Sequence, residues 1–194
     1  MKTRILSLII IFTALAVVLN IYGPKIPYPL YPFLWFQLWE IPIVTAFLMA
    51  GPRSGVIVAT INTLLLLAVF PGGLPTGPLY NFVAILSMFL GMYLPYWYAK
   101  RQCKTENFGV YLRRNLVLFS VTAIALGTLL RVLLLTVVNY FALQQTFPIG
   151  FSMPAEAVIV FLPLGAIFNA IVALYTIPMA IGIAAVIMSR TKLQ

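Results

Sequence analysis

Long apolar runs, separated by short polar or proline-rich stretches, organise the whole chain. An α-helix needs about 20 predominantly apolar residues to cross the hydrocarbon core of a bilayer. Four of the runs approach or exceed this length, and two shorter runs are candidate spans as well. The pattern predicts one compact helical domain over residues 1–194, with about six transmembrane helices near residues 5–21, 33–50, 55–70, 79–99, 115–142 and 156–188.

The composition supports a membrane location. Hydrophobic residues make up 63% of the chain and charged residues 8%, and the mean hydropathy is +1.07. Such a chain is too apolar for a soluble domain and lacks the low-complexity composition of a disordered one. The first apolar run follows a basic start, as a secretory signal does, but no small-x-small cleavage site follows before Pro24. We therefore expect an all-α integral membrane protein that retains its first helix.

The basic residues are distributed unevenly across the predicted membrane. An even number of spans places both termini on one side, and cytoplasmic loops carry the excess of Lys and Arg. Lys25 is then external, Arg131 lies within a span, and the others are cytoplasmic: Lys2, Arg4, Arg53, Lys100, Arg101, Lys104, Arg113, Arg114, Arg190 and Lys192. Cytoplasmic termini in the plasma membrane, with contact to anionic lipid, explain the net charge of +9, so nucleic acid is not an expected partner. Cys103 falls on the cytoplasmic side, where we expect a reduced, inert thiol.

The predicted external linkers differ from the cytoplasmic ones. Residues 22–32, 71–78 and 144–154 are rich in proline and aromatic residues, whereas residues 51–55 form a tight cytoplasmic turn and residues 100–114 a polar, basic loop. Aromatic residues of the external linkers suit the interfacial belt of a membrane protein. Prolines restrict φ, so the same linkers also suit a preorganised lid.

Groups for catalysis are scarce. The chain has no histidine, and its three acidic residues, Glu40, Glu106 and Glu156, are far apart in sequence. No carboxylate cluster, cysteine set or Ser/His/Asp arrangement is available for hydrolysis or a metal site. We therefore expect neither an enzyme nor a resident metal or cofactor. A Walker motif is also missing, so this chain is not expected to hydrolyse ATP by itself.

A small set of polar and aromatic side chains lies near the external ends of the predicted helices. Arg131 is the most informative, because a guanidinium inside a long apolar run must face a protein interior or a polar ligand. Gln37 and Glu40 are one turn apart on the predicted second helix, and Arg131 and Asn139 share a broad face of the fifth. The candidate substrate-binding residues are Trp35, Gln37, Trp39, Glu40, Asn81, Arg131, Asn139 and Asn169.

Structural alternatives exist for each of these residues. Arg131 can pair with Glu40 or with backbone carbonyls instead of a ligand. The asparagines can cap or bridge helices. Trp35 and Trp39 can belong to the interfacial belt, or they can stack on a flat ligand.

Six short motifs follow one another along the chain and cover nearly all of it: Phe33–Pro42, Gly51–Gly55, Gly73–Phe82, Leu126–Thr128, Val138–Phe141 and Phe161–Pro163. In order and spacing the chain resembles the substrate-binding S components of energy-coupling factor (ECF) vitamin transporters, most closely the riboflavin-binding branch. The resemblance implies a six-helix protein that captures a vitamin from outside and joins a transmembrane coupling subunit and two cytoplasmic ATPase subunits. It also implies a pocket lined by residues 37–42, by Asn139 and by the stretch after Pro163. The first helix would meet the coupling subunit through small residues, here Ser7, Thr13, Ala14 and Ala16.

The chain departs from the riboflavin branch at several positions. Gln37 and Glu40 stand where that branch usually carries two aspartates, and Gly165 and Phe168 stand where its sixth helix usually carries an asparagine and a lysine. Riboflavin is therefore the first expectation, with another vitamin or precursor, anionic ones included, as the alternative. A standalone secondary transporter and a non-transporting assembly protein are further alternatives. So short a chain shows no gate, which favours rigid-body reorientation of the whole subunit as the transport motion.

Overall fold

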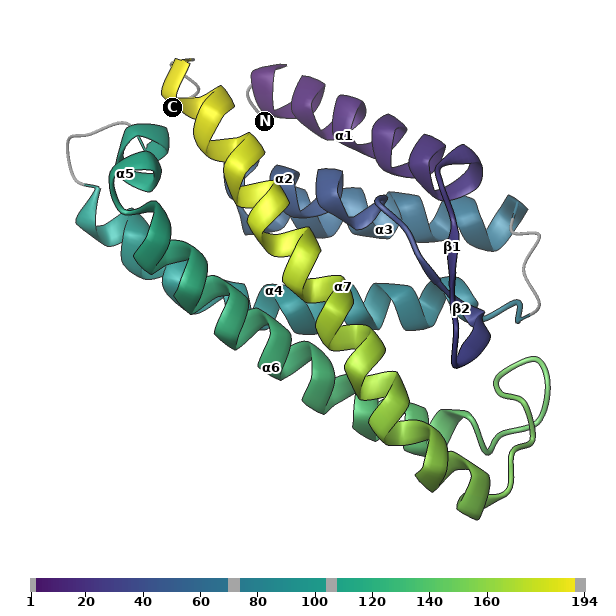
Figure 1. The fold of residues 1–194 in the computed structure, drawn as a ribbon. Helices are drawn as coiled ribbons and strands as arrows, with labels where there is room; N and C mark the ends of the chain where they lie inside the picture. Colours follow the sequence, from purple (N-terminus) through teal and green to yellow (C-terminus); the bar gives the residue numbers. More distant parts are fainter. Residues whose placement is uncertain (1–2, 70–73, 104–107, 191–194) are drawn as a thin grey trace.

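The computed structural model describes residues 3–69, 74–103 and 108–190 and is almost entirely helical (Figure 1). The elements are α1 (Thr3–Tyr22), β1 (Ile26–Tyr28), β2 (Tyr31–Phe36), α2 (Glu40–Ala50), α3 (Pro52–Val69), α4 (Gly77–Gln102), α5 (Phe108–Arg114), α6 (Leu116–Ala142) and α7 (Ala155–Arg190). Several residues of the sequence predictions lie outside the described residues: Lys2, Pro71, Gly73, Lys104, Glu106 and Lys192. The prediction of an all-α membrane protein is confirmed.

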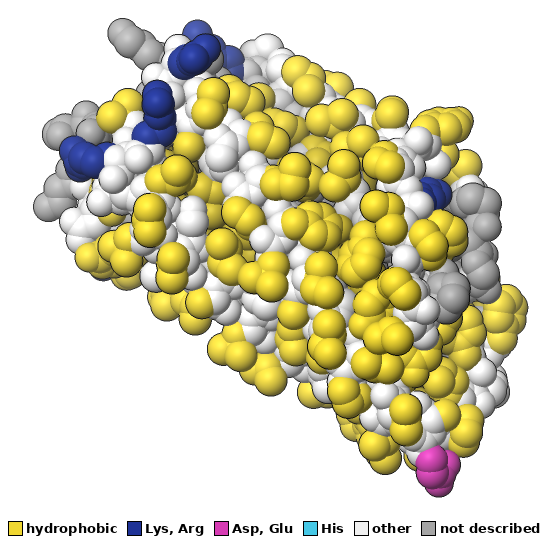
Figure 2. Space-filling view, in the orientation of Figure 1, with side chains coloured by type: hydrophobic (Ala, Val, Ile, Leu, Met, Phe, Trp, Pro, Cys, Tyr) yellow, Lys and Arg dark blue, Asp and Glu magenta, His cyan; other side chains and the backbone are white. Residues whose placement is uncertain are grey.

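Five of the described helices, α1, α3, α4, α6 and α7, are long and apolar enough to cross a membrane. The termini lie together at one end of the bundle, near α5, and the β1–β2 hairpin and the loop after α6 lie toward the other end (Figure 1). Figure 2 shows hydrophobic side chains over most of the visible face and most of the visible Lys and Arg near the termini. This arrangement fits the predicted cytoplasmic side, and we call the opposite end external.

The prediction of one helix over residues 33–50 is wrong in its first part. Residues Tyr31–Phe36 form a strand that pairs antiparallel with β1, and α2 begins at Glu40. Pro42 has no N–H to donate, so it favours a helix that begins shortly before it, although α4 and α7 do continue through Pro95 and Pro163. A start at Glu40 places Pro42 in the first turn, where a missing N–H costs nothing.

As a result, α2 is too short to cross the bilayer by itself. Its 11 residues span about 16 Å, against a hydrocarbon core of about 30 Å. The second crossing is therefore part strand and part helix. Non-helical backbone at membrane depth is tolerated where it is buried in protein or lines a cavity. The hairpin thus marks the region in which a cavity is expected.

The loop predicted over residues 100–114 also contains a helix. The seven-residue α5 packs against the cytoplasmic end of α7, and its Phe108 is completely buried. The Tyr96 ring lies 5.4 Å from the Phe108 ring in an edge-on arrangement. The basic residues of this segment led to the prediction of a loop, and its apolar residues were too few to indicate a helix.

Small residues set the close packing of the long helices. A Cβ on Gly91 of α4 would lie 2.1 Å from the carbonyl oxygen of Leu126 on α6, and one on Gly127 would lie 2.8 Å from Ile177 Cδ1 on α7. At Gly91 the clash would be with backbone, so only glycine permits this approach of α4 and α6. Close packing of this kind drives helix association in lipid, where there is no hydrophobic drive between helices.

The solid core fills the cytoplasmic half of the molecule. There α2 is buried along nearly its whole length between α1, α3 and α7, and the Phe47 ring stacks on Phe89 at 4.5 Å. Toward the external end the packing divides into two smaller clusters, one around Tyr28 and Phe168 and one around Leu143 and Phe161. The cavity described next lies between these clusters and the main core.

Candidate ligand-binding cavity

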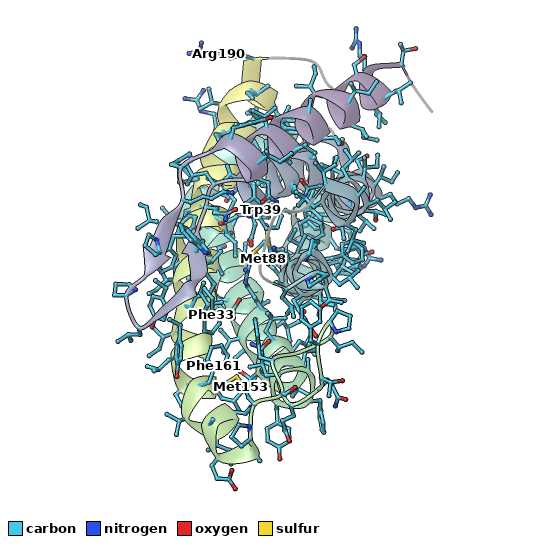
Figure 3. All side chains as sticks on the ribbon, turned by 90° about the vertical axis from the view of Figure 1, so that its right-hand side faces the viewer. Phe33, Trp39, Met88, Met153, Phe161 and Arg190 are labelled. Atoms are coloured by element: carbon cyan, nitrogen blue, oxygen red, sulfur yellow. The ribbon has the colours of Figure 1, made fainter. Side chains whose placement is uncertain are left out.

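A cavity of about 310 Å³ lies between the hairpin and the long helices. Its walls come from α1, β2, the start of α2, α4, α6, the loop after α6, and α7, so segments far apart in the sequence enclose it. In Figure 3, Trp39 lies just below α1, and Phe33 and Phe161 lie farther from the termini. Trp39 and the two phenylalanines are among the lining residues and show the direction in which the cavity extends.

Glu40, Arg131 and Asn169 form a buried hydrogen-bonded group on the cavity wall. Arg131 Nη1 and Nη2 donate to Glu40 Oε2 and Oε1 at 2.5 and 2.9 Å, and Arg131 Nε donates to Asn169 Oδ1 at 3.2 Å. Arg131 is 3% exposed and Glu40 4%. A two-pronged Arg–carboxylate contact is among the strongest hydrogen-bonded pairs in proteins. The pair that the sequence left as an alternative to ligand binding is thus present.

Local structure holds each member of this group in place. Glu40 is the first residue of α2, where the exposed N–H groups and the helix dipole favour a carboxylate. Asn169 Nδ2 donates to the carbonyl oxygen of Gly165 one turn earlier on α7, at 2.9 Å. The group therefore links α2, α6 and α7. Because the negative charge of Glu40 balances the positive charge of Arg131, the group makes this part of the wall strongly polar without a net charge.

Gln37 is not on the second helix, contrary to the sequence prediction. It lies in the segment between β2 and α2, and Tyr175 Oη of α7 donates to its backbone carbonyl at 2.7 Å. This bond attaches the non-helical segment to α7. The Gln37 side chain lines the cavity, and its buried Oε1 has no hydrogen-bond partner among the described residues.

Aromatic side chains form the external part of the wall. The rings of Phe33 and Phe161 are 6.0 Å apart and 22° from parallel, and Phe151 from the loop after α6 lies 5.7 Å from Phe33. The Phe168 ring of α7 lies 4.9 Å from Phe36. These rings give the cavity an aromatic region beside its polar group, which suits a ligand with a flat ring and polar substituents.

The external loops are attached to the helices by hydrogen bonds. Tyr28 Oη donates to the carbonyl oxygen of Leu164 on α7 at 3.4 Å, which holds the hairpin on that helix. Thr76 Oγ1 donates to the carbonyl oxygen of Pro148 at 2.7 Å, and Tyr80 Oη donates to that of Ile149. Of the two interpretations of these loops, an interfacial aromatic belt or a preorganised lid, the contacts favour the lid.

All eight predicted substrate-binding residues line this cavity: Trp35, Gln37, Trp39, Glu40, Asn81, Arg131, Asn139 and Asn169. The two tryptophans differ in environment, because Trp39 is 4% exposed whereas Trp35 is 44% exposed. Trp39 is therefore an interior wall residue rather than a belt residue. A role of these eight residues in binding remains a prediction.

Sequence reasoning missed other lining residues, among them Asn20, Phe151 and Phe161, whereas Phe168 and Tyr175 lie in the stretch after Pro163 that the resemblance implied. Phe161 sits in an apolar stretch and looks like an ordinary membrane-facing residue there, while Phe151 is one of the aromatic residues of the external linker 144–154. Asn20 carried a usable signal, since it is a polar residue near the end of the first apolar run. Only the small residues of that run were considered, as a contact surface for the coupling subunit, and its polar end was not.

The residues predicted to contact a coupling subunit divide between two faces of α1. Ser7 and Ala14 are exposed, so they stay predictions. Thr13 is 8% exposed and Ala16 is fully buried, so the structure contradicts their place on an outer surface. They face the bundle, where α1 packs against α2 and α3.

Two comparisons with known proteins are informative, while no protein-family model matches the chain. The chain is 29% identical over 152 residues to the riboflavin transporter RibU of Staphylococcus aureus (strain TCH60), which is 78% of this chain and 71% of that protein. Its fold matches a solved S component of a bacterial ECF transporter with a TM-score of 0.67 and 26% identity, over 98% of this chain and 95% of the other. The prediction of an S component close to the riboflavin-binding branch is confirmed.

Proposed function

We propose that this S component captures riboflavin from the external side of the plasma membrane and delivers it through an ECF-type, ATP-driven transporter. The observation that carries the proposal is the cavity, in which aromatic rings and a polar group without net charge lie on one continuous wall. Its volume of about 310 Å³ is at the lower end of the range of about 300–1,000 Å³ for small-molecule sites. The similarity to a riboflavin transporter supports the same ligand.

The chemistry of the wall matches that of a flavin. A flavin has a flat ring system for the aromatic region around Phe33 and Phe161, and aromatic contacts contribute about 0.5–1.5 kcal/mol each beyond buried area. Its ring carbonyls, ring N–H and chain hydroxyls suit the polar side chains, which fix orientation.

The Glu40–Arg131 pair favours an uncharged ligand over an anionic one. Riboflavin has no formal charge at neutral pH. An anion at Arg131 would place a second negative group beside the buried Glu40 carboxylate, which already balances the guanidinium, and an anion that displaced Glu40 would leave a carboxylate that is 4% exposed unpaired. Leaving a buried charge without its partner costs about 3–5 kcal/mol. The anionic alternative is therefore disfavoured.

Transport would require the coupling subunit and the two ATPase subunits, because this chain carries no ATPase motif. The external loops are hydrogen-bonded to the helices, and the cytoplasmic half of the bundle is solidly packed. Both observations support rigid-body reorientation of the whole subunit as the transport motion.

Binding and uptake test the proposal separately. The purified protein should quench riboflavin fluorescence in a saturable titration, and mass spectrometry of co-purified small molecules should detect riboflavin. In a host without its own riboflavin uptake, accumulation should require this chain together with the coupling subunit and active ATPases. Uptake by the chain alone would indicate a secondary transporter. If the protein neither binds riboflavin nor supports its uptake, the proposal is refuted.

A further inference from the structure

The last turn of α1 brings a buried amide group to the cavity. Asn20 lines the cavity wall and is 5% exposed, and its Nδ2 has no hydrogen-bond partner among the described residues. Trp39, another lining residue, is similarly buried at 4% exposed, so both side chains belong to the interior part of the wall.

An unpaired buried donor destabilises the protein that carries it, and such groups are rare in native structures. A leucine has nearly the shape of asparagine and would avoid that cost in an otherwise apolar turn. Asn20 therefore leaves a donor on the cavity wall that no described group of the protein satisfies, and a ligand in the cavity is placed to accept from it.

We propose that Asn20 is a specificity-determining residue, whose Nδ2 donates a hydrogen bond to an uncharged carbonyl or hydroxyl oxygen of the bound ligand. The inference rests on the proposed function, because a flavin provides both kinds of oxygen, in its ring and in its chain. Gln37 Oε1, an unpartnered buried acceptor on the same wall, is the complementary group for a ligand N–H or O–H.

The chain contains a matched control for this inference. Asn62 on α3 is 1% exposed, and its Oδ1 also lacks a partner among the described residues, but Asn62 is not part of the cavity wall. An effect that arises from burial of an unpaired amide should appear at both asparagines. An effect on the ligand should appear at Asn20 alone.

The experiment measures two quantities on the purified full-length protein: the thermal unfolding midpoint without ligand, and the dissociation constant of riboflavin. Asn20→Leu should raise the unfolding midpoint by about 2–4 °C, because the unpaired group is gone, and weaken riboflavin binding about tenfold. Asn62→Leu should give a similar rise in the midpoint with unchanged affinity.

A second ligand identifies the oxygen. Lumiflavin has the flavin ring with a methyl group in place of the sugar-alcohol chain. If Asn20→Leu weakens both ligands equally, the acceptor is a ring carbonyl; if it weakens riboflavin alone, the acceptor is a chain hydroxyl. Should Asn20→Leu fail to fold, Asn20→Asp keeps the shape and replaces the donor with an acceptor, and it should lose at least as much affinity.

Unchanged riboflavin affinity in a folded Asn20 variant would overturn this inference and leave the proposed function intact. Equal losses of affinity in Asn20→Leu and Asn62→Leu would also overturn it, since the effect would then be general to the fold. A wild-type protein that does not bind riboflavin would refute the proposed function and, with it, this inference.

Discussion

The buried pair of Glu40 and Arg131 gives a prediction about stability whose size follows from the structure. Removing the charge of Glu40 leaves the Arg131 guanidinium without its carboxylate, and removing Arg131 leaves the Glu40 carboxylate without its donors. Both side chains are only 3–4% exposed. Breaking a buried pair in this way costs about 3–5 kcal/mol. For a chain of this length, with about 2–4 °C per kcal/mol, Glu40→Gln or Arg131→Met should lower the unfolding midpoint by roughly 6–20 °C.

The double variant Glu40→Gln/Arg131→Met decides between pairing and independent roles. With both charges removed, neither partner is left uncompensated, so the double variant should be more stable than the sum of the two single losses predicts. Thermal unfolding in detergent, followed by circular dichroism, measures all four corners of this cycle. Arg53→Met, at an exposed position in the first turn of α3, is the control and should change stability by about 0.5 kcal/mol or less.

Additive single losses would refute the reasoning, because they would mean that the two side chains do not stabilise each other. Near-normal stability of Arg131→Met, combined with a ten- to hundredfold loss of riboflavin affinity, would also refute it. That result would assign the guanidinium to the ligand instead of to Glu40.

Three further predictions concern packing, assembly and orientation. Gly91→Ala should destabilise the protein by about 1–3 kcal/mol or more in the same unfolding assay, since its Cβ would lie 2.1 Å from a backbone oxygen of α6; stability equal to wild type would contradict the observed helix contact. Ala14→Trp on the exposed face of α1 should block co-purification with the coupling subunit and leave riboflavin affinity intact, whereas Ala16→Trp, at a fully buried position, should prevent folding. If both variants lose binding and assembly together, α1 is not an assembly surface. With the native cysteine replaced by serine, Pro27→Cys should react with an impermeant thiol reagent in intact cells and Arg53→Cys should not; the reverse pattern would invert the predicted topology.

The sequence alone was sufficient for the membrane location, the approximate helices and the candidate polar residues. Hydrocarbon forces backbone hydrogen bonds to be made internally, so long apolar runs indicate helices without knowledge of their neighbours. The same physics indicated Arg131, because a charge in an apolar run needs a partner wherever the chain folds. Pro42 fits the start of α2 at Glu40 but did not by itself indicate the break, since α4 and α7 contain internal prolines.

Tertiary structure decided which partner and which face each residue meets. Arg131 pairs with Glu40 across 91 positions of the chain, and only the packing of α2, α6 and α7 sets the distance between them. On α1, nothing in the sequence separated Ala14, which is exposed, from Ala16, which is buried. A helix in lipid is apolar on all sides, so the periodicity that marks the inner face of a soluble helix is missing. The inner face of α1, including the cavity residue Asn20, is therefore defined by its neighbours in space and not by its own pattern.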